Sequence, residues 1–417
     1  MTGVAPLLDL SSRDPRTPST PRPGPVRLGA DRLVEDPRLL AGAERLGLVT
    51  NDAARTAADV ERLSRTALLE AGIPIVRLFS PEHGLNATAP DGAAVPGGTD
   101  PVTGLPVVSL YGERMRPAPE SLEGLDGVIV DLPDVGTRCY TYGWTMTHVI
   151  DVCAEKGLPV WILDRPNPLS GALAAVEGPI LEPAHRSFIG RHTIPLRHGL
   201  TLGELARLWQ RECRPTAHVH VIACEGWRRD QLWPETGLPF VPTSPAIRRF
   251  EAALLYPGLC LFEATNLSVG RGTETPFEAV GAPWLDADAV AERLVARRLP
   301  GVVVTTDAFT PEADPYAGQR CAAVRFTVQD PTLVRPVALG LALLADIAAL
   351  HPGAFAWMRY PTAANPTGAG HLERLTGTAT IRDVISTVPE SVDAATIAAW
   401  TAADGWAERA GAVLLYT

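Results

Sequence analysis

Polar side chains with catalytic potential follow six short apolar segments of this chain, each at the point where a strand is predicted to end. In FSPEHG, Glu82 and His83 stand side by side directly after the apolar run 73–80. The same position after the other five runs is occupied by acids, amides, a tyrosine and an arginine. The full set is Asn51, Glu82, His83, Tyr111, Glu113, Asp131, Asp134, Asp164, Arg165, Asn167 and Glu225.

Carboxylates dominate this set, with tyrosines nearby, and that profile suits glycoside hydrolysis. In such a reaction a protonated acid meets the leaving oxygen and a second group acts at the anomeric carbon. Tyr111, Tyr140 and Tyr142 could pack against the faces of a sugar. Residue types alone therefore indicate a carbohydrate-directed site.

Each candidate also has a structural interpretation. Glu82 could cap the following helix, and His83 could support other residues rather than react. Asp131 and Asp134 in DLPDVG could fix a turn through their side-chain oxygens. Asp164 and Arg165 could form an ion pair that holds a proline-rich loop.

The sequence lacks the motifs that mark several other classes of enzyme. The chain has no G-x-S-x-G elbow, no G-x-G-x-x-G after the first strand and no H-E-x-x-H motif. The glycine-rich stretch SVGRGTETPF lacks the ending of a phosphate-binding loop. The histidines at 218 and 220 are poor evidence for zinc on their own.

The elements that must position these residues alternate in the manner of an α/β protein. Short β-branched runs at 45–51, 73–80, 105–112, 125–134, 158–168 and 218–227 are separated by helical patterns at 58–72, 140–157 and 201–213. Such continuous apolar strands predict a parallel sheet covered on both faces. The carboxyl ends of its strands form the edge at which ligands bind.

The regular alternation of strands and helices ends at about residue 240. The stretch 256–284 is rich in glycine, proline and threonine and is expected to be ordered loop with short strands. Strands at 301–309 and 321–330 and helices around 339–350 and 394–406 then predict a smaller α+β domain. The expected division is a disordered Pro-rich tail (1–27), a catalytic α/β domain (28–240) and a C-terminal domain that completes the cleft (241–417).

Composition restricts the partners and the compartment. The formal net charge of -10 argues against nucleic acid or an anionic membrane as the main partner. Six scattered cysteines without a C-x-x-C pair argue against a disulfide framework and a thiolate zinc site. The first residues do not read as a signal peptide, so a cytoplasmic protein is expected. Oligomeric state is left open.

The sequence resembles the exo-β-N-acetylmuramidases of the NamZ type from about residue 44 to the C-terminus. The resemblance rests on ordered blocks: GLVTN, FSPEHG, TGLPVVSLYG, DLPDVGTRCYTYGWTM, LDRPNPLSG, VEGP, PLRHGLTLGELA and LFEATNLSVGRGTETPFEAVGAPW. It implies a Rossmann-like domain followed by a smaller domain, with the active cleft between them. It also implies release of N-acetylmuramic acid from the non-reducing end of peptidoglycan fragments without a metal or organic cofactor.

Carried over by position, the resemblance makes Glu82 the expected catalytic acid, with Asp131 and Glu177 as candidates for a second catalytic carboxylate. The residues expected to bind or position substrate are His83, Asp134, Arg138, Tyr140, Tyr142, Asp164, Arg165, Asn167, His198, Asn266, Arg271 and Glu274. Among them Arg138, Arg165 and Arg271 are candidates for pairing with the lactyl carboxylate of the sugar.

The chain departs from the family pattern at two places. Pro133 and Cys139 replace a glutamine and an aromatic residue in the DLPDVGTRCYTY block, and TSPAIRR replaces PSPNMPT, so an amide is lost at Ala246. A changed loop beside the cleft could alter the sugar recognised. Retaining, inverting and substrate-assisted mechanisms all stay open, as do a glycosidase for a different amino sugar and a non-catalytic sugar-binding protein.

Overall fold

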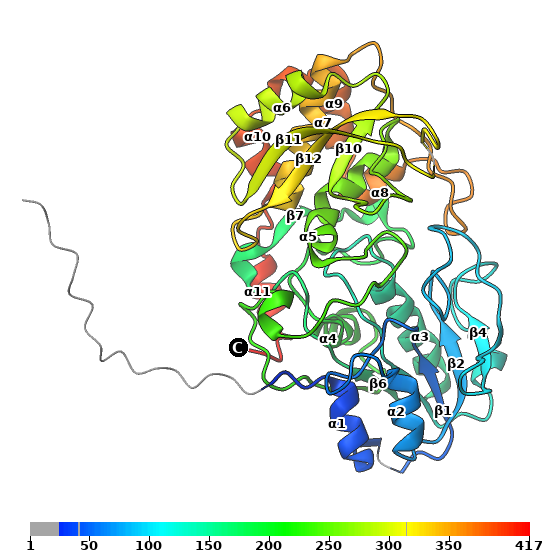
Figure 1. Ribbon diagram of the computed structural model, residues 1–417. Coiled ribbons are helices and arrows are strands. Elements are labelled where there is room, and N and C mark those ends of the chain that lie inside the picture. The colour runs from blue at the N-terminus through cyan, green and yellow to red at the C-terminus, as the bar shows by residue number, and fades with distance from the viewer. Residues whose placement is uncertain (1–24, 41, 314) are drawn as a thin grey trace, which may run out of the picture.

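The computed structural model describes residues 25–40, 42–313 and 315–417 (Figure 1). Most of the predicted Pro-rich tail therefore lies outside the described residues. Its last residues are placed: Val26 is buried, and Arg27 forms an isolated antiparallel bridge with Glu225. No helix within these ranges is long and apolar enough to cross a membrane.

A seven-stranded sheet forms the first half of the chain, in the order β3-β4-β2-β1-β5-β6-β9. Six of its strands pair in parallel, and the short β3 is antiparallel to β4. The strands are β1 (Leu46–Val49), β2 (Ile75–Ser80), β3 (Gly98–Thr99), β4 (Pro106–Ser109), β5 (Gly127–Val130), β6 (Val160–Leu163) and β9 (Val219–Ile222). The predicted parallel sheet is thus confirmed.

Both faces of this sheet are covered. Successive residues of a strand point to opposite faces, and here they enter different cores: Leu48 packs in one apolar cluster and Val49 in another. Helix α1 (Gly29–Glu35) and α2 (Ser64–Glu70) contribute to the first cluster, whereas α3 (Tyr142–Lys156) and α4 (Leu202–Cys213) contribute to the second. Burial on both faces explains the near-continuous apolar strands.

Local signals fix the ends of α3 and α4. Thr201 accepts a hydrogen bond from the N–H of Glu204 at 3.1 Å, and Glu204 accepts one from the N–H of Thr201 at 3.1 Å, which forms a capping box at the start of α4. Gly157 ends α3 in the left-handed conformation. Helix α2 begins six residues later than predicted, because residues 55–63 form a turn closed by a bridge between Arg55 and Leu63.

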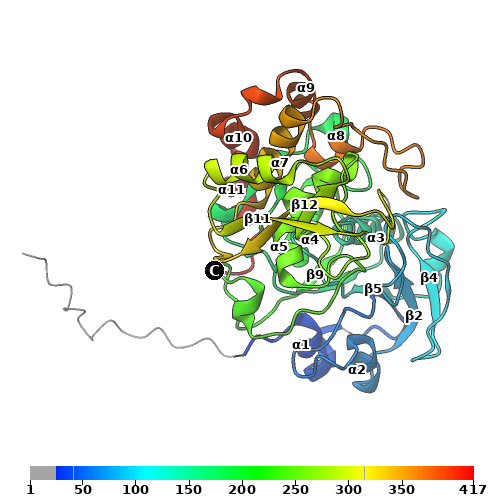
Figure 2. The same cartoon turned by 45° about the horizontal axis from the view of Figure 1, so that its top comes forward.

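The second half of the chain forms a smaller α+β domain, seen at the top of Figure 1 and turned forward in Figure 2. Its antiparallel sheet has the order β10-β12-β11. These strands are β10 (Ala279–Ala282), β11 (Val302–Phe309) and β12 (Cys321–Val328). Its helices are α5 (Phe250–Leu259), α6 (Ala287–Ala296), α7 (Pro336–Leu350), α8 (His371–Thr376), α9 (Thr380–Thr387), α10 (Ala394–Thr401) and α11 (Trp406–Gly411).

Shorter elements complete the chain. A two-stranded sheet pairs β7 (Glu177–Ile180) with β8 (Pro195–Arg197). The 3-10 helices are η1 (Pro37–Leu40), η2 (Pro119–Leu122), η3 (Leu173–Ala175), η4 (Pro183–His185), η5 (Trp233–Thr236), η6 (Cys260–Ala264) and η7 (Pro389–Ser391).

The expectation of ordered loop with short strands over 256–284 is wrong at its start, where α5 and η6 continue the helix past Pro257. The apolar run 250–259 is buried on almost every side against α7, which outweighs the cost of one proline near the helix end. Gly258 and Gly340 allow this close packing, because a Cβ on Gly258 would lie 1.8 Å from the carbonyl oxygen of Pro336. The packing of α5 against α7 places η6 beside the first domain.

The two halves are also joined by the end of the chain. The hydroxyl of Tyr416 donates to Oδ2 of Asp164 at 2.5 Å, and the N–H of Leu415 donates to Oε1 of Glu204 at 2.9 Å. The C-terminal residues therefore return to the α/β domain. This return helps to hold the two domains together around the space between them.

Candidate active site

A cavity lies between the carboxyl edge of the parallel sheet and the C-terminal domain. Its empty volume, including the open mouth, is about 700 Å³. The first domain contributes polar and aromatic side chains from the loops after β2, β4 and β5, and the second contributes η6, the segment after it and α8. The ionisable and aromatic lining residues are Glu82, His83, Asp91, Tyr111, Tyr140, Phe188, Tyr256, Glu263, Arg271, Phe277, Tyr360, His371 and Arg374.

Glu82 is held in place by two hydrogen bonds. The hydroxyl of Thr141 donates to Oε2 at 2.7 Å, and the backbone N–H of Gly92 donates to Oε1 at 2.9 Å. The turn that aims Glu82 is closed by a hydrogen bond from the N–H of Gly84 to the carbonyl oxygen of Pro81. The side chain is buried, so its carboxyl group is largely removed from water.

His83 occupies the left-handed region of backbone conformation, with φ at 68°. Its Nδ1 lies 2.8 Å from the carbonyl oxygen of Ala89. A carbonyl can only accept, so Nδ1 donates and carries a proton. The ring is thereby fixed against the loop that follows it.

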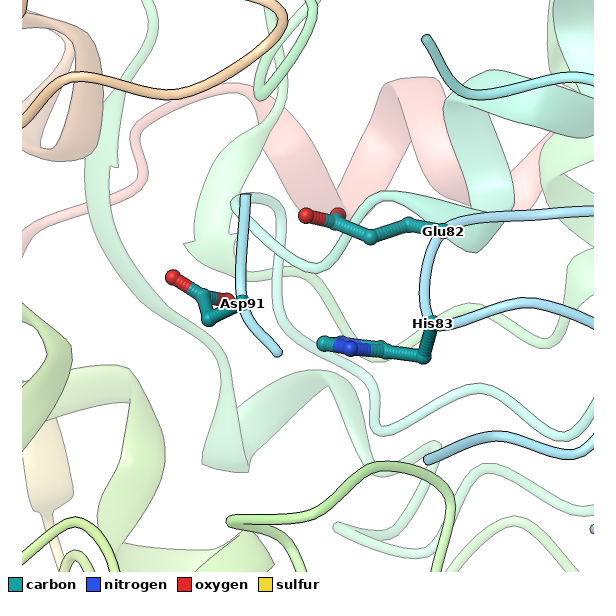
Figure 3. A group of neighbouring side chains, drawn as sticks. All are labelled: Glu82, His83 and Asp91. Atoms are coloured by element: carbon teal, nitrogen blue, oxygen red, sulfur yellow. The ribbon is translucent and has the colours of Figure 1, made fainter. Parts of the chain in front are cut away.

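Asp91 lies beside Glu82 and His83 (Figure 3). The ligand atoms of Glu82, His83 and Asp91 all lie within 4.8 Å of one another. The hydroxyl of Tyr360 donates to Oδ2 of Asp91 at 2.6 Å, and the guanidinium of Arg271 lies 3.5 Å from the same oxygen. The C-terminal domain thus fixes one oxygen of Asp91.

The environment shifts the pKa values of the two carboxyl groups in opposite directions. Burial, reinforced by the neighbouring charge of Asp91, raises the pKa of Glu82 above its ordinary 4.5. Burial alone would also raise the pKa of Asp91, but the charge of Arg271 and the hydrogen bond from Tyr360 outweigh it and hold that pKa below 3.8. Paired carboxyl groups with separated pKa values are the usual arrangement for one acid and one anion.

Arg271 is already neutralised within the cavity. Its guanidinium is 2.5 Å from Oε1 of Glu263 and 3.5 Å from Asp91, and it lies over the ring of Phe277 at 5.0 Å. His371 stacks on Tyr360, with ring centroids 4.7 Å apart, and its Nε2 is 3.5 Å from Glu263. This network fixes the groups that surround Asp91.

A cation could in principle be held by Glu82, His83 and Asp91, since each offers a ligand atom within 4.8 Å of the others. The surrounding groups do not favour it. Hydrogen-bond donors already occupy both oxygens of Glu82 and one of Asp91, and the charge of Arg271 lies beside Asp91. A raised pKa at Glu82 also disfavours the ionised form that binds metal.

The structure places five of the residues expected from the sequence in this cavity: Glu82, His83, Tyr111, Tyr140 and Arg271. Tyr140 donates from its hydroxyl to Oγ1 of Thr243 at 2.9 Å, which presents its ring to the cavity wall. Tyr142 lies behind Tyr140 and bonds the carbonyl oxygen of Thr243 at 2.9 Å.

The two residues expected as second catalytic carboxylates lie elsewhere. Asp131 is fully buried, accepts a hydrogen bond from Nε of Arg165 at 2.7 Å and is also bonded by the hydroxyl of Ser64. Glu177 accepts the N–H of Ala338 at 3.1 Å, at the start of α7, and burial raises its pKa. Both carboxylates therefore hold structural elements together.

The remaining expected residues also have partners outside the cavity. Asp134 accepts the N–H of Gly136, and burial raises its pKa to about 7. Arg138 donates to three backbone carbonyls, Asp164 accepts from Thr201 and Tyr416, and Asn167 donates to Leu200. His198 is buried with a pKa lowered to about 3, Asn266 bonds Ala354 and Ala356, and Glu274 is exposed.

Sequence reasoning missed Asp91, Glu263, Tyr360, His371 and Arg374. Asp91 stands in an Asp-Gly pair within the loop that follows Glu82, where it reads as a turn residue. The signal that could have found it is its place in the same strand-end loop. Glu263 lies in the block LFEATN, which carries the family resemblance, but the other four residues lie outside the blocks that carry it.

Both departures from the family pattern touch this cavity. Cys139 and Ala246 line it, and Sγ of Cys139 lies 3.4 Å from Sγ of Cys260 in η6. Arg248 is exposed, and Arg249 points away to pair with Glu278. The two arginines of TSPAIRR are therefore not part of the cavity lining.

Comparisons with known proteins find relatives that span most of this chain. The family described as "Exo-beta-N-acetylmuramidase NamZ" matches through its N-terminal part at residues 46–251 and its C-terminal part at residues 254–416. A Bacillus subtilis (strain 168) protein, "Peptidoglycan beta-N-acetylmuramidase NamZ", is 38% identical over 362 residues, which are 86% of this chain and 84% of the relative. Crystal structures of two DUF1343 family proteins from Bacteroides fragilis NCTC 9343 superpose with TM-scores of 0.81 and 0.72. Each is 27% identical and covers 94% of this chain and 99% of its own.

Proposed function

The chain belongs to the NamZ family of exo-β-N-acetylmuramidases, and from that membership we propose that it is an exo-acting glycosidase. Its substrate is a peptidoglycan-type fragment that ends in β-linked N-acetylmuramic acid, and its product is the free sugar. The observation that carries the proposal is the pairing of buried Glu82 with half-buried Asp91, whose pKa values are shifted apart. Residues 28–240 and 241–417 supply the two sides of the cleft.

Glu82 is the general acid. Burial raises its pKa and so favours its protonated form, which can give its proton to the glycosidic oxygen as the bond from that oxygen to the anomeric carbon breaks. The positive charge that develops on the sugar lies beside the anionic Asp91. The hydrogen bond from Thr141 fixes the orientation of the acid.

Asp91 is the second carboxylate of the reaction. Inverting glycosidases need roughly 6.5–9.5 Å between their carboxyl groups to admit a water molecule, whereas retaining enzymes need about 5–5.5 Å. The nearest ligand atoms of Glu82 and Asp91 lie within 4.8 Å. This spacing favours retention, with Asp91 attacking the anomeric carbon or steadying a 2-acetamido group that attacks in its place.

In the second half of the reaction, Glu82 is ionised and acts as the base. It takes a proton from water, the resulting hydroxide attacks the anomeric carbon, and the bond formed in the first step breaks. Glu82 ends protonated, as it began, and N-acetylmuramic acid leaves. The aromatic side chains of Tyr111 and Tyr140 offer faces against which the sugar ring can pack.

The test uses a β-linked disaccharide with N-acetylmuramic acid at its non-reducing end and the matching disaccharide that ends in N-acetylglucosamine. Release from the muramic acid substrate, with the β-anomer seen first by NMR, supports the proposal. Release from the glucosamine substrate alone would assign the cleft to another amino sugar. Sugar binding without release from either would make the protein a binding module.

A further inference from the structure

Helix α8 turns one face toward the cavity. His371, Arg374 and Leu375 are spaced so that they fall on the same side of the helix, and all three line the cavity. His371 is engaged with Tyr360 and Glu263. Arg374 therefore brings a guanidinium to the cavity wall beside residues that already surround the reacting pair.

No carboxylate of the cavity contacts the guanidinium of Arg374. The cavity is lined by the carboxyl groups of Glu82, Asp91 and Glu263 and by the guanidinium groups of Arg271 and Arg374. Arg271 lies against both Glu263 and Asp91, and Glu82 is bonded to Thr141 and Gly92. Within the described ranges, the guanidinium of Arg374 has no carboxylate within 4.0 Å and makes no hydrogen bond.

The other arginines that could serve an acidic sugar are committed elsewhere. Arg138 is buried and donates to the carbonyl oxygens of Pro179, Ile194 and Leu375. Arg165 is paired with Asp131. A half-buried arginine without an anion, in a cavity whose other cation is neutralised, is suited to bind an anionic group of the ligand.

We infer that Arg374 binds the carboxylate of the 3-O-lactyl group of N-acetylmuramic acid and so selects this sugar over N-acetylglucosamine. The inference rests on the proposed function, since it names the acidic group that the same cavity receives. N-acetylglucosamine carries an uncharged hydroxyl at this position, so Arg374 would add little to its binding. The carboxylate accepts two parallel N–H bonds from the guanidinium.

The test compares wild type, Arg374→Gln and Arg374→Lys on a chromogenic β-N-acetylmuramide and on its lactyl methyl ester, which keeps the ring and removes the charge. Arg374→Gln should lower kcat/KM for the acid by about ten- to a hundredfold, the range of a charge-assisted hydrogen bond, and leave the ester nearly unchanged. Arg374→Lys should keep part of the preference, because it retains the cation but not the planar fork.

Arg359→Gln is the matched control, because it removes the same charge from an exposed side chain outside the cavity lining. It should keep the wild-type ratio of acid to ester. An Arg374→Gln protein that folds normally by thermal unfolding and keeps that ratio overturns the inference while leaving the proposed function intact.

If wild type hydrolyses neither compound, the proposed function fails and binding decides the inference separately. Titration calorimetry with free N-acetylmuramic acid and free N-acetylglucosamine then replaces the rate measurement. Tighter binding of the acidic sugar that is lost in Arg374→Gln supports the role of Arg374. Equal binding of both sugars to the two proteins contradicts it.

Discussion

The backbone N–H of Gly92 donates a 2.9 Å hydrogen bond to Oε1 of Glu82, which ties the loop that carries Asp91 to the residue at the end of β2. Gly92 has a φ of 68°, and a Cβ at this position would meet Cγ2 of Thr362 at 2.7 Å. The loop therefore approaches both Glu82 and the C-terminal domain closely. The acid and the anion are therefore positioned as one unit.

The first prediction concerns the pH dependence of activity. Catalysis needs Asp91 ionised and Glu82 protonated, so kcat/KM should follow a bell-shaped profile. The acid limb reports Asp91 and lies below pH 3.8, because its pKa is lowered, and the alkaline limb reports Glu82 and lies above pH 4.5, because its pKa is raised. A rate that is flat through the acid and neutral range would contradict these roles.

The second prediction concerns Asp91→Asn. Loss of the anion should lower kcat by about a hundredfold or more, by analogy with the loss of one group that stabilises transition-state charge. It should also move the alkaline limb of residual activity to lower pH, because the charge of Asp91 helps to raise the pKa of Glu82. Activity in the wild-type range, with an unmoved limb, would remove Asp91 from the mechanism.

The third prediction separates structure from catalysis at Asp131. Asp131→Ala leaves the buried Arg165 without its carboxylate, so unfolding free energy should fall by about 3–5 kcal/mol. The folded fraction should keep a near-normal kcat, because Asp131 lies outside the cavity that holds Glu82. Chemical denaturation and active-site-normalised kinetics measure the two effects. A large fall in kcat without loss of stability would contradict the assignment.

The fourth prediction concerns metal removal. Dialysis against EDTA should leave activity unchanged, because hydrogen-bond donors and Arg271 already satisfy the carboxylates of Glu82 and Asp91. The measurement is the hydrolysis rate before and after chelation, with trace metal analysis. Inactivation by EDTA that a divalent cation reverses would instead assign a metal to Glu82, His83 and Asp91.

Much of the first domain could be predicted because its signals are local. Apolar runs predicted the positions of β1, β2, β4, β5, β6 and β9, and the helical pattern at 201–213 predicted α4. The parallel sheet then required that Glu82 and the other strand-end residues lie along one edge. Local chemistry did not reveal that residues 55–63 form a turn or that α5 continues past Pro257.

The composition of the site was less predictable, because it depends on contacts between distant residues. Asp131 and Asp91 both follow strands, yet Asp131 is satisfied by Arg165 from the neighbouring strand end, and Asp91 faces the cavity. Tyr360 reaches Asp91 across 269 residues of sequence. Partners this far apart leave no pattern of spacing, so the second carboxylate became visible only in three dimensions.

The most direct test of the account is the leaving-group dependence of Glu82→Gln. The variant keeps the size of the side chain and cannot donate a catalytic proton. Its kcat/KM on the natural disaccharide should fall by about a thousandfold, within the range for loss of a general acid, and much less on a β-N-acetylmuramide with a 2,4-dinitrophenyl leaving group that needs no proton. Equal losses on both substrates, or hydrolysis of the disaccharide at the wild-type rate, would contradict the assignment of Glu82 as the acid.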